Sequence, residues 1–263
     1  MKVSIVTISF NQIEFLKECI ESVLSQNYDN LEYIIVDPGS TDGSRDLIES
    51  YGEKIISLFE SDDGPSDGLN KGFSKASGDI FGFLNSDDYF LPNAIKNIVD
   101  SFNNSQTTDV ISGHSLIVDE QSNTLRKFYS DRMSLGRYAY QGVILSQPST
   151  FFRSSLYKKT SGFNVDNRSN WDGELFSDFA ILGSKFSVIN KILSAYRLQK
   201  DSITSTGKLL DSHKRHLEAS FEKIMNRRMT KFDLILCIWF RFLRKILNPR
   251  DTLERIKYGP IFL

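Results

Sequence analysis

The stretch IFGFLNSDD, residues 80–88, decides the fold expected for this chain. Its first five residues form an apolar run with the length of a buried strand, and the run ends abruptly at Asn85. Asp87 and Asp88 then place two carboxylates at the carboxyl end of the strand, where open α/β sheets bind ligands. With no His or Cys close by, such a pair suits Mg²⁺ or Mn²⁺ carrying phosphates better than zinc. The alternative is an Asx-type turn leading to a helix opened by Pro92.

Short apolar runs alternate with helical patterns through the first half of the chain. The expected strand and helix pairs cover residues 3–10 and 13–24, 33–36 and 44–51, 55–59 and 67–76, and 80–84 and 93–102. Four such units predict an α/β fold with a mainly parallel sheet flanked by helices. After about residue 105, the runs 110–118 and 125–129 predict a small antiparallel region, where structure for binding an acceptor would be added.

The composition is that of an ordinary soluble protein, long enough for one large domain and an appendage. The chain has 263 residues, of which 40% are hydrophobic and 25% are charged. It runs from Met1 directly into a strand pattern without the features of a secretory signal, so we expect it in the cytosol. Cys19 and Cys237 each lie in an apolar helical pattern and are predicted to be buried free thiols.

The net charge of −1 hides an asymmetry between two parts of the chain. Residues 1–206 contain 19 Lys and Arg against 27 Asp and Glu, whereas residues 207–263 contain 13 against 6. This difference predicts a main domain over residues 1–206 and a basic helical tail over residues 207–263, with different partners.

Loops that follow parallel strands open on the same edge of the sheet, so the first, second and fourth predicted strands should share one site. The first loop carries Ser9, Phe10 and Asn11, whose hydroxyl, aromatic face and amide could hold a nucleobase and its ribose. In the second, Asp37 can accept a hydrogen bond from a base or ribose, and Gly39 lets the backbone approach a ligand. Both loops also fit plain turns before helices.

The connection over residues 60–72 is unusually polar and rich in glycine. Its acids, Asp63 among them, could read the base, and Asn70 or Lys71 could reach the phosphates, although each side chain also fits a solvated position. The chain contains neither G-x-x-x-x-G-K-[S/T] nor G-x-G-x-x-G, which argues against a P-loop and a dinucleotide-binding fold. We expect no nucleic acid partner.

Six segments then stand in a characteristic order and spacing. They are VSIVTISFNQIEFLKECIESVLSQ (3–26), YIIVDPGSTDGS (33–44), DGPSDGLNKGF (63–73), ASGDIFGFLNSDD (76–88), QPSTFFR (147–153) and WDGELF (171–176). Together they make the chain resemble family 2 glycosyltransferases of the GT-A fold over about residues 3–205. It is similar in particular to bacterial enzymes that build O-antigen, capsule or exopolysaccharide repeat units.

The resemblance implies a metal-dependent, inverting hexosyltransferase that moves a sugar from a nucleotide diphosphate, with UDP-sugar favoured, to a glycan or lipid-linked acceptor. Residues 1–104 would bind the nucleotide sugar and residues 105–206 the acceptor. Asp37 and the Ser9-Phe10 segment would contact the nucleobase, and Asp87 and Asp88 would hold Mn²⁺ or Mg²⁺, with Asp88 the nearer ligand.

The resemblance also assigns the acceptor side. Asp172 falls where the family keeps its general base, Glu174 would orient the acceptor or tune that base, and Gln147 and Trp171 would lie beside them. Taken from the residues alone, Asp172 is instead the N-cap of a helix beginning near Glu174.

Four positions depart from the commoner family pattern. Asn85 replaces an acid at the start of the metal motif, and Pro38 replaces a second acid in the base-binding loop. Gln199 stands where many relatives have His, which removes a metal or phosphate contact, and Asp178 stands where Arg is frequent. These departures bear on nucleobase preference, metal binding and the acceptor site.

The tail combines basic charge with apolar helical patterns over residues 208–229 and 232–247. The second, FDLILCIWFRFLRKIL, is shorter than the ~20 apolar residues that cross a bilayer, and Asp233 and Arg241 interrupt it. We expect residues 208–247 to lie in the interface of the inner face of the cell membrane, where anionic lipids attract Lys and Arg. The alternatives are packing on the catalytic domain or against a second subunit.

Two other functions fit parts of the sequence. A catalytically idle GT-A domain could bind a nucleotide sugar or scaffold a membrane-bound assembly, which the four departures allow but Asp37, Asp88 and Asp172 disfavour. A nucleotidyltransferase is disfavoured because no loop rich in glycine and lysine follows residues 3–10. The sugar, the acceptor, the linkage and the oligomeric state stay open.

Overall fold

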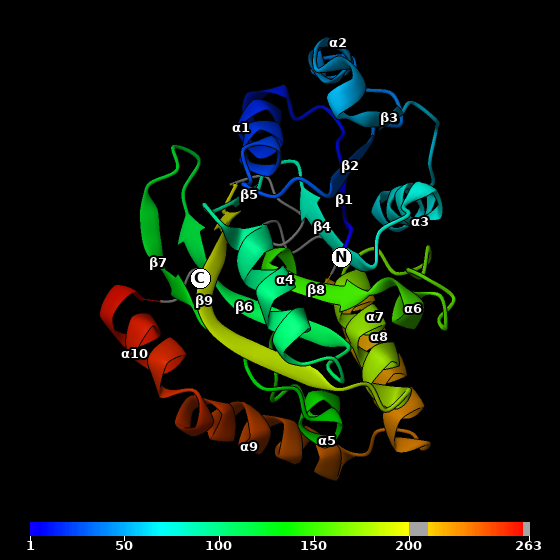
Figure 1. Cartoon of the computed structure of the whole chain (residues 1–263). Helices are drawn as coiled ribbons and strands as arrows, with labels where there is room; N and C mark the ends of the chain where they lie inside the picture. The colour runs from blue at the N-terminus through cyan, green and yellow to red at the C-terminus, as the bar shows by residue number, and fades with distance from the viewer. Residues whose placement is uncertain (200–209, 260–263) are drawn as a thin grey trace.

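The structure, a computed structural model, describes residues 1–199 and 210–259 (Figure 1). The predicted domain boundary after residue 206 and the predicted start of the first tail helix at residue 208 lie outside the described residues.

The first half of the chain alternates strands and helices as the apolar periodicity predicts. Its elements are β1 (Val3–Ile8), α1 (Ile13–Leu24), β2 (Leu31–Val36), α2 (Ser44–Ser50), η1 (Gly52–Lys54), β3 (Ile56–Leu58), α3 (Pro65–Lys75), β4 (Ile80–Asn85), β5 (Tyr89–Phe90) and α4 (Ala94–Asn104). Strands β1 to β4 pair in parallel in the order β3-β2-β1-β4, so their carboxyl ends meet at one edge. The expected parallel α/β core is confirmed.

The second half extends the same sheet with strands of mixed direction. Its elements are β6 (Val110–Val118), β7 (Thr124–Phe128), α5 (Leu135–Ala139), η2 (Gln147–Ser149), β8 (Thr150–Arg153), α6 (Ser154–Tyr157), α7 (Trp171–Ile181) and β9 (Phe186–Arg197). In the described chain the sheet order continues β8-β6-β9-β5, with β7 also on β6. The predicted antiparallel pair is confirmed as β6 and β7. The long β9, parallel to β6, was not predicted.

Two apolar layers cover the faces of the sheet. On one face, α1 and α4 bury residues at helical spacing, among them Leu16, Cys19 and Phe102. On the other, α3 and α7 bury an aromatic group that includes Phe73 and Phe179. Cys19 and Cys237 are buried free thiols, as predicted. The sheet is thereby held rigidly behind the edge where β1, β2 and β4 end.

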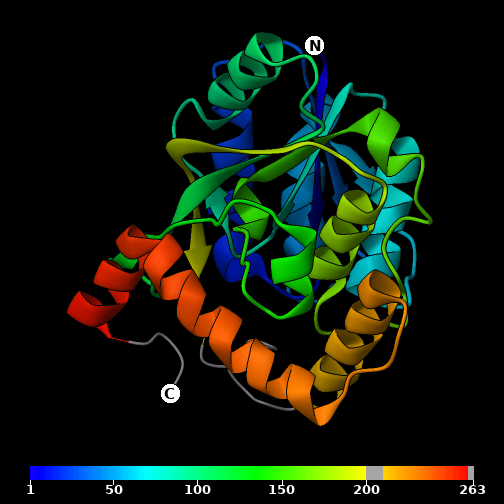
Figure 2. The ribbon, with the colours of Figure 1, turned by 90° about the horizontal axis from the view of Figure 1, so that it is seen from below.

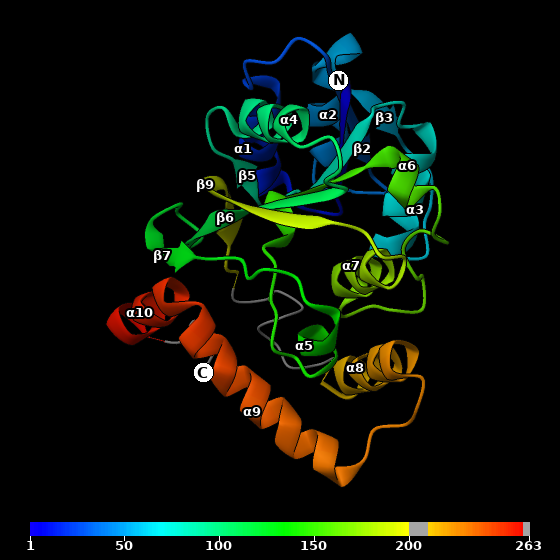
Figure 3. The same ribbon diagram turned by 60° about the horizontal axis from the view of Figure 1, so that its bottom comes forward.

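The described residues of the tail form three helices, α8 (Leu210–Met225), α9 (Lys231–Leu247) and α10 (Pro249–Tyr258), which run along one side of the molecule (Figures 2 and 3). Phe221 of α8 and Cys237 of α9 pack with Tyr140 beside α5 in a small apolar cluster. Asp178, one of the unusual positions, forms an ion pair with Lys223 of α8 at 2.5 Å. Its carboxylate therefore fastens the tail to α7. No helix in the described parts of the chain is long and apolar enough to cross a membrane.

Candidate active site

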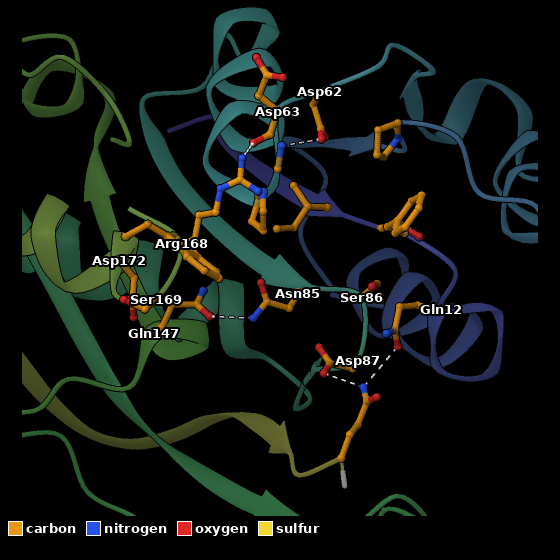
Figure 4. Close-up of a pocket in the computed structure, with 18 of the residues that line it drawn as sticks. Gln12, Asp62, Asp63, Asn85, Ser86, Asp87, Gln147, Arg168, Ser169 and Asp172 are labelled. Carbon is orange, nitrogen blue, oxygen red and sulfur yellow. Dashed lines mark hydrogen bonds between the residues drawn. The ribbon is translucent and has the colours of Figure 1, made fainter. Parts of the chain in front are cut away.

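A cavity of about 830 Å³ opens at the carboxyl ends of β1 and β4 (Figure 4). Predicted site residues from both halves of the chain line it: Ser9, Phe10, Asp63, Asp87, Gln147, Trp171 and Asp172. Asn11, Asp37, Gly39, Asn70, Lys71, Asp88 and Glu174 do not line it. The fold thus brings together segments up to 163 positions apart, from Ser9 to Asp172.

The two adjacent carboxylates occupy different positions. Asp87 lies on the cavity wall, and its Oδ2 accepts a hydrogen bond from Nε2 of Gln199 at 2.7 Å. Asp88 lies behind it, 1% exposed, with Oδ1 accepting from the backbone N–H of Arg197 at 2.9 Å. Burial raises the pKa of both carboxyl groups, and the charge of Asp87 raises the pKa of Asp88 further. Two buried acids side by side favour a cation between or beside them.

Oxygen atoms without partners show how well this corner fits a divalent cation. Oδ2 of Asp88 and Oδ1 of Asn85 are buried and accept no hydrogen bond within the part of the chain that the structure describes. Among the same residues, no group of three or more His, Cys, Asp and Glu side chains could hold a metal ion. Mg²⁺ and Mn²⁺ suit such a sparse set of hard oxygen ligands, because water and substrate phosphates complete their coordination.

Arg197 holds this acidic turn in place, a role that the sequence reasoning missed. Its Nε donates to the backbone oxygen of Asp87 at 2.8 Å, and its guanidinium lies over the Phe15 ring at 4.8 Å from the centroid. The same guanidinium forms an ion pair with Glu18. The sequence carried no signal for this role, because the strand β9 that ends at Arg197 was not predicted. The turn that carries Asp87 is therefore anchored to both α1 and β9.

The loop after β2 is ordered by Asp37. This side chain is fully buried, and its oxygens accept from the backbone N–H groups of Gly39 and Ser40, at 3.0 and 2.7 Å, and from Arg45 at 3.2 Å. These bonds hold the carboxylate within the loop, and Asp37 does not line the cavity. Pro38, the next residue, lines the cavity instead.

The loop after β1 is tied to the loop after β2. Asn11 has a φ of +51°, its N–H donates to Ser40, and its side-chain oxygen accepts from the N–H of Thr41. This arrangement exposes Phe10 at the cavity mouth, while Ser9 remains buried with its hydroxyl oxygen unpartnered within the described residues. An aromatic face and a buried hydroxyl thus border the space beside Pro38.

Asp172 lies in the first turn of α7, which begins at Trp171 and is preceded by Asn170. The prediction that Asp172 caps a helix starting near Glu174 is therefore wrong, because the helix starts three residues earlier. The side chain lines the main cavity and also a second cavity of about 410 Å³, as does Gln147. In the view of Figure 4, Gln147 and Asn85 lie between Asp172 and Asp87.

Three other predicted residues have structural partners away from the cavity. The Asn70 side chain donates a hydrogen bond to the backbone oxygen of Phe163 and accepts one from its N–H, both at 2.8 Å. Lys71 forms an ion pair with Asp67 at 2.8 Å. Glu174 accepts hydrogen bonds from the side chains of Asn164 and Asn167. The contacts of Asn70 and Glu174 fix the loop before α7, whereas the pair of Lys71 with Asp67 lies within α3.

The cavity also contains polar residues that the sequence reasoning did not select. Arg168 lines it and donates to the backbone oxygen of Asp63 at 3.2 Å, and Gln12 contacts Gln199 at 3.2 Å. Asp62 lines the same wall, where burial raises its pKa. Arg168 belongs to a polar loop without periodicity, so its sequence carries no signal for this position.

Comparisons with known proteins agree with this geometry. The family model described as "Glycosyl transferase family 2" matches residues 4–162. An uncharacterized glycosyltransferase of Nostoc sp. is 34% identical over 212 residues, which cover 75% of this chain and 65% of that protein. Glycosyltransferase GlyG of Streptococcus pneumoniae is 27% identical over 271 residues, which cover 96% of this chain and 89% of GlyG.

Solved structures share the fold at low sequence identity. Residues 1–349 of Staphylococcus aureus TarS, in complex with UDP-GlcNAc, superpose with a TM-score of 0.66 at 20% identity, covering 97% of this chain and 74% of that one. The mannosyltransferase PcManGT of Pyrobaculum calidifontis, in complex with GDP-Man and Mn²⁺, gives a TM-score of 0.66 at 17% identity and covers 98% and 73%.

Proposed function

The chain belongs to glycosyl transferase family 2, and on that premise we propose that it transfers a sugar from a nucleotide diphosphate, with UDP-sugar favoured, to a hydroxyl of a glycan or lipid-linked acceptor in surface polysaccharide synthesis. The observation that carries the proposal is that Asp87 and Asp172 line the same cavity. Asp87 is followed by Asp88, whose Oδ2 has no hydrogen-bond partner among the described residues. Asp172 lines both this cavity and the second one.

The reaction that these residues support is a single displacement with inversion. Asp172 accepts the proton of the acceptor hydroxyl while that oxygen attacks the anomeric carbon from the face opposite the nucleotide. The bond between the anomeric carbon and the phosphate oxygen breaks, and its electron pair leaves with the nucleoside diphosphate. A divalent cation held by Asp87, with Asp88 and Asn85 behind it, would supply charge stabilisation to that leaving group. Because Asp87 lines the cavity, we assign it as the nearer ligand.

The donor half of the cavity has features that suit a nucleoside. Phe10 can stack on a base, and the Ser9 hydroxyl and the backbone beside Pro38 can bond its edge or the ribose. Arg168 adds a cation opposite the acidic turn, where it can meet the phosphates. Asp37 supports this pocket by ordering the loop.

Release of free nucleoside diphosphate tests the proposed function. We expect the purified protein to hydrolyse one donor slowly among UDP-, GDP- and dTDP-sugars in Mn²⁺ or Mg²⁺, and EDTA to stop the release. Such an outcome identifies the donor and the metal dependence together. Binding of a donor by calorimetry without turnover, even when sugar acceptors are added, would favour the catalytically idle alternative.

The tail supports a second proposal, about where the enzyme works. The inner side of its helix α9 is fastened by both apolar and polar contacts: Cys237 and Phe240 pack at Tyr140, and Arg244 pairs with Asp131 at 2.5 Å. The opposite side carries large apolar residues that are each more than half exposed: Phe232, Leu234, Ile235, Ile238, Trp239, Phe242, Ile246 and Leu247. Exposed Lys231, Arg241 and Lys245 border them. We call these eight apolar residues the outer face of α9.

We propose that the outer face of α9 docks on an anionic membrane surface. A basic helix with Trp and Phe on an exposed apolar side binds the boundary of headgroups and acyl chains, and each Lys or Arg adds ~1 kcal/mol on anionic lipid. The contacts of Cys237, Phe240 and Arg244 support the alternative of packing on the catalytic domain as well, but for the inner side of the helix. Packing on the catalytic domain and docking on a membrane therefore involve different sides of α9.

Liposome flotation tests this docking. We expect the wild type to float with vesicles containing anionic phospholipid, and the triple variant Ile238→Ser, Trp239→Ser, Phe242→Ser to remain in the dense fraction. The matched control replaces two exposed apolar residues away from the tail, Ile181→Ser and Leu182→Ser, and should float like the wild type. Equal flotation of all three proteins would rule out the proposal, and so would a dimer that covers the outer face and excludes vesicles.

A further inference from the structure

A second cavity, of about 410 Å³, adjoins the proposed active site, and we call it the side cavity. Asp172, Gln147 and Tyr196 line both spaces. The rest of its wall is mostly apolar and includes Ile117, Phe128, Ile144 and Leu198. Two arginines interrupt this wall, Arg126 from β7 and Arg255 from the tail helix α10. A compound in the side cavity would therefore reach the proposed base from the side opposite the metal site.

Arg126 is an unusual residue for such a wall. It is only 4% exposed, and its Nε has no hydrogen-bond partner among residues 1–199 and 210–259. Its Nη1 donates to the backbone oxygen of Lys127 at 3.3 Å and lies 3.5 Å from Asp251. Buried guanidinium groups are normally paired and fully hydrogen-bonded, because an unpaired buried charge is costly. The wall thus contains a cation whose donors are only partly used.

Arg126 shares its nearest anion with two other arginines. Asp251 is the anion nearest to Arg126, but it already pairs with Arg244 at 2.9 Å and with Arg255 at 2.8 Å. Glu254 accepts a hydrogen bond from the backbone N–H of Lys127. Burial, followed by the charge of Arg255, lowers the pKa of Arg126. An anion placed between Arg126 and Arg255 would offset this repulsion.

We propose that the side cavity binds a phosphate group of the acceptor, held by Arg126 and Arg255, next to the sugar whose hydroxyl faces Asp172. This inference rests on the proposed function and specifies its acceptor class. A phosphate has enough oxygens to accept from two guanidinium groups at once, which a carboxylate does less well. The apolar wall fits the organic group beyond the phosphate. A diphosphate-linked lipid sugar and a glycan with phosphodiester links share this chemistry.

Titration with inorganic pyrophosphate tests the anion site without any catalysis. Calorimetry is run in EDTA, so that binding does not depend on the metal site. We expect the wild type to bind, and Arg126→Gln and Arg255→Gln each to bind ~10-fold more weakly, about 1.4 kcal/mol, since each variant loses a hydrogen bond to a charged group. Arg255 is less buried than Arg126, so Arg255→Gln still tests the site if Arg126→Gln does not fold.

Two controls define the location of the bound anion. Arg250→Gln removes the same charge from the same helix outside the side cavity and should bind like the wild type. Arg168→Gln removes a cation from the donor cavity, so the binding that this variant retains is assigned to the side cavity. Binding that is lost in Arg168→Gln and kept in Arg126→Gln would overturn the proposal, as would equal affinities for malonate and pyrophosphate.

Kinetics with different acceptors distinguish a diphosphate-linked lipid sugar from a glycan with phosphodiester links. They also test the anion site separately from the proposed function. With the active donor, the same sugar is offered as a neutral alkyl glycoside, an alkyl diphosphate and an alkyl phosphodiester. We expect kcat/KM to favour a phosphate-bearing acceptor at least ~10-fold through a lower KM, and Arg255→Gln to remove that preference without changing the rate on the neutral glycoside. The favoured ester identifies the source. Absence of turnover counts against the proposed function, and the pyrophosphate titration then decides the anion site alone.

Discussion

Asp172→Asn is expected to lower sugar transfer by ~10²- to 10⁴-fold, which is the usual contribution of a positioned general base. Asn keeps the size of the side chain and one acceptor oxygen but cannot take up the proton of the acceptor hydroxyl. Because Asp172 lies in the first turn of α7 and faces both cavities, the substitution leaves the helix and the donor pocket intact. Initial rates with saturating donor and acceptor, beside the affinity for the nucleoside diphosphate, measure the effect.

The matched control is Asp178→Asn, the same substitution six positions further along α7. Asp178 pairs with Lys223 of the tail and lines neither cavity, so its variant should keep turnover within a few-fold of the wild type. Donor affinity should be unchanged in both variants. If Asp172→Asn retained most of its activity, the base would have to be another group, and the assignment of the acceptor side would be wrong.

The fold could be predicted where local periodicity and tertiary burial agree. The pairs of apolar runs and helical patterns became β1 to β4 with α1 to α4, because β1, β2 and β4 are buried on both faces and each helix packs one side on the sheet, while β3 is a short exposed edge strand. The strand β9 escaped prediction because its burial alternates poorly, and its pairing with β6 is irregular near His114. Its role depends on contacts with residues far away in sequence, which a local pattern does not contain.

The site could be predicted to the level of its loops but not to the level of individual atoms. The carboxyl edge of the parallel strands follows from topology, and it placed Ser9, Phe10 and Asp87 in the cavity. Which neighbour faces the ligand depends on side-chain packing. Asn70 was expected at the phosphates, yet it binds the chain at Phe163, whereas Asp62 lines the wall.

The side of the tail helix α9 that packs on the domain could not be predicted from its sequence either. Its amphipathic pattern predicted a helix with one apolar side, and the usual expectation is that the apolar side packs on the domain. The structure divides the apolar residues of α9 between two sides, because Cys237 and Phe240 pack at Tyr140 while the outer face is exposed. Arg244 is held on the inner side by Asp131, a partner that nothing in the sequence of α9 identifies.

Asp87→Asn is expected to abolish metal-dependent transfer, with a loss of at least ~10²-fold. A metal ion that acts as a Lewis acid supplies several kcal/mol, and each 1.36 kcal/mol is tenfold in rate. The carboxylate of Asp87 lines the cavity, where Gln199 orients it at 2.7 Å, so its charge faces the donor phosphates directly. The variant keeps this hydrogen bond through its amide oxygen but loses the charge that a cation requires.

Thermal unfolding provides a measurement that does not depend on turnover. Mn²⁺ at about 100 times its dissociation constant should stabilise the wild type by ~2.7 kcal/mol, seen as a rise in Tm, and Asp87→Asn should show no such rise. Asp100→Asn, which alters an exposed acid on α4 paired with Lys96, should respond like the wild type.

Comparison with Asp88→Asn decides between the two adjacent acids. Asp88 is buried behind the wall, and its Oδ1 is already held by the backbone of Arg197, an interaction that Asn can keep. If Asp87 is the nearer ligand, Asp88→Asn weakens the Mn²⁺ response without removing it. The opposite order, with Asp88→Asn unresponsive and Asp87→Asn nearly normal, would mean that the turn held by Arg197 rearranges when the metal binds, and would restore Asp88 as the direct ligand.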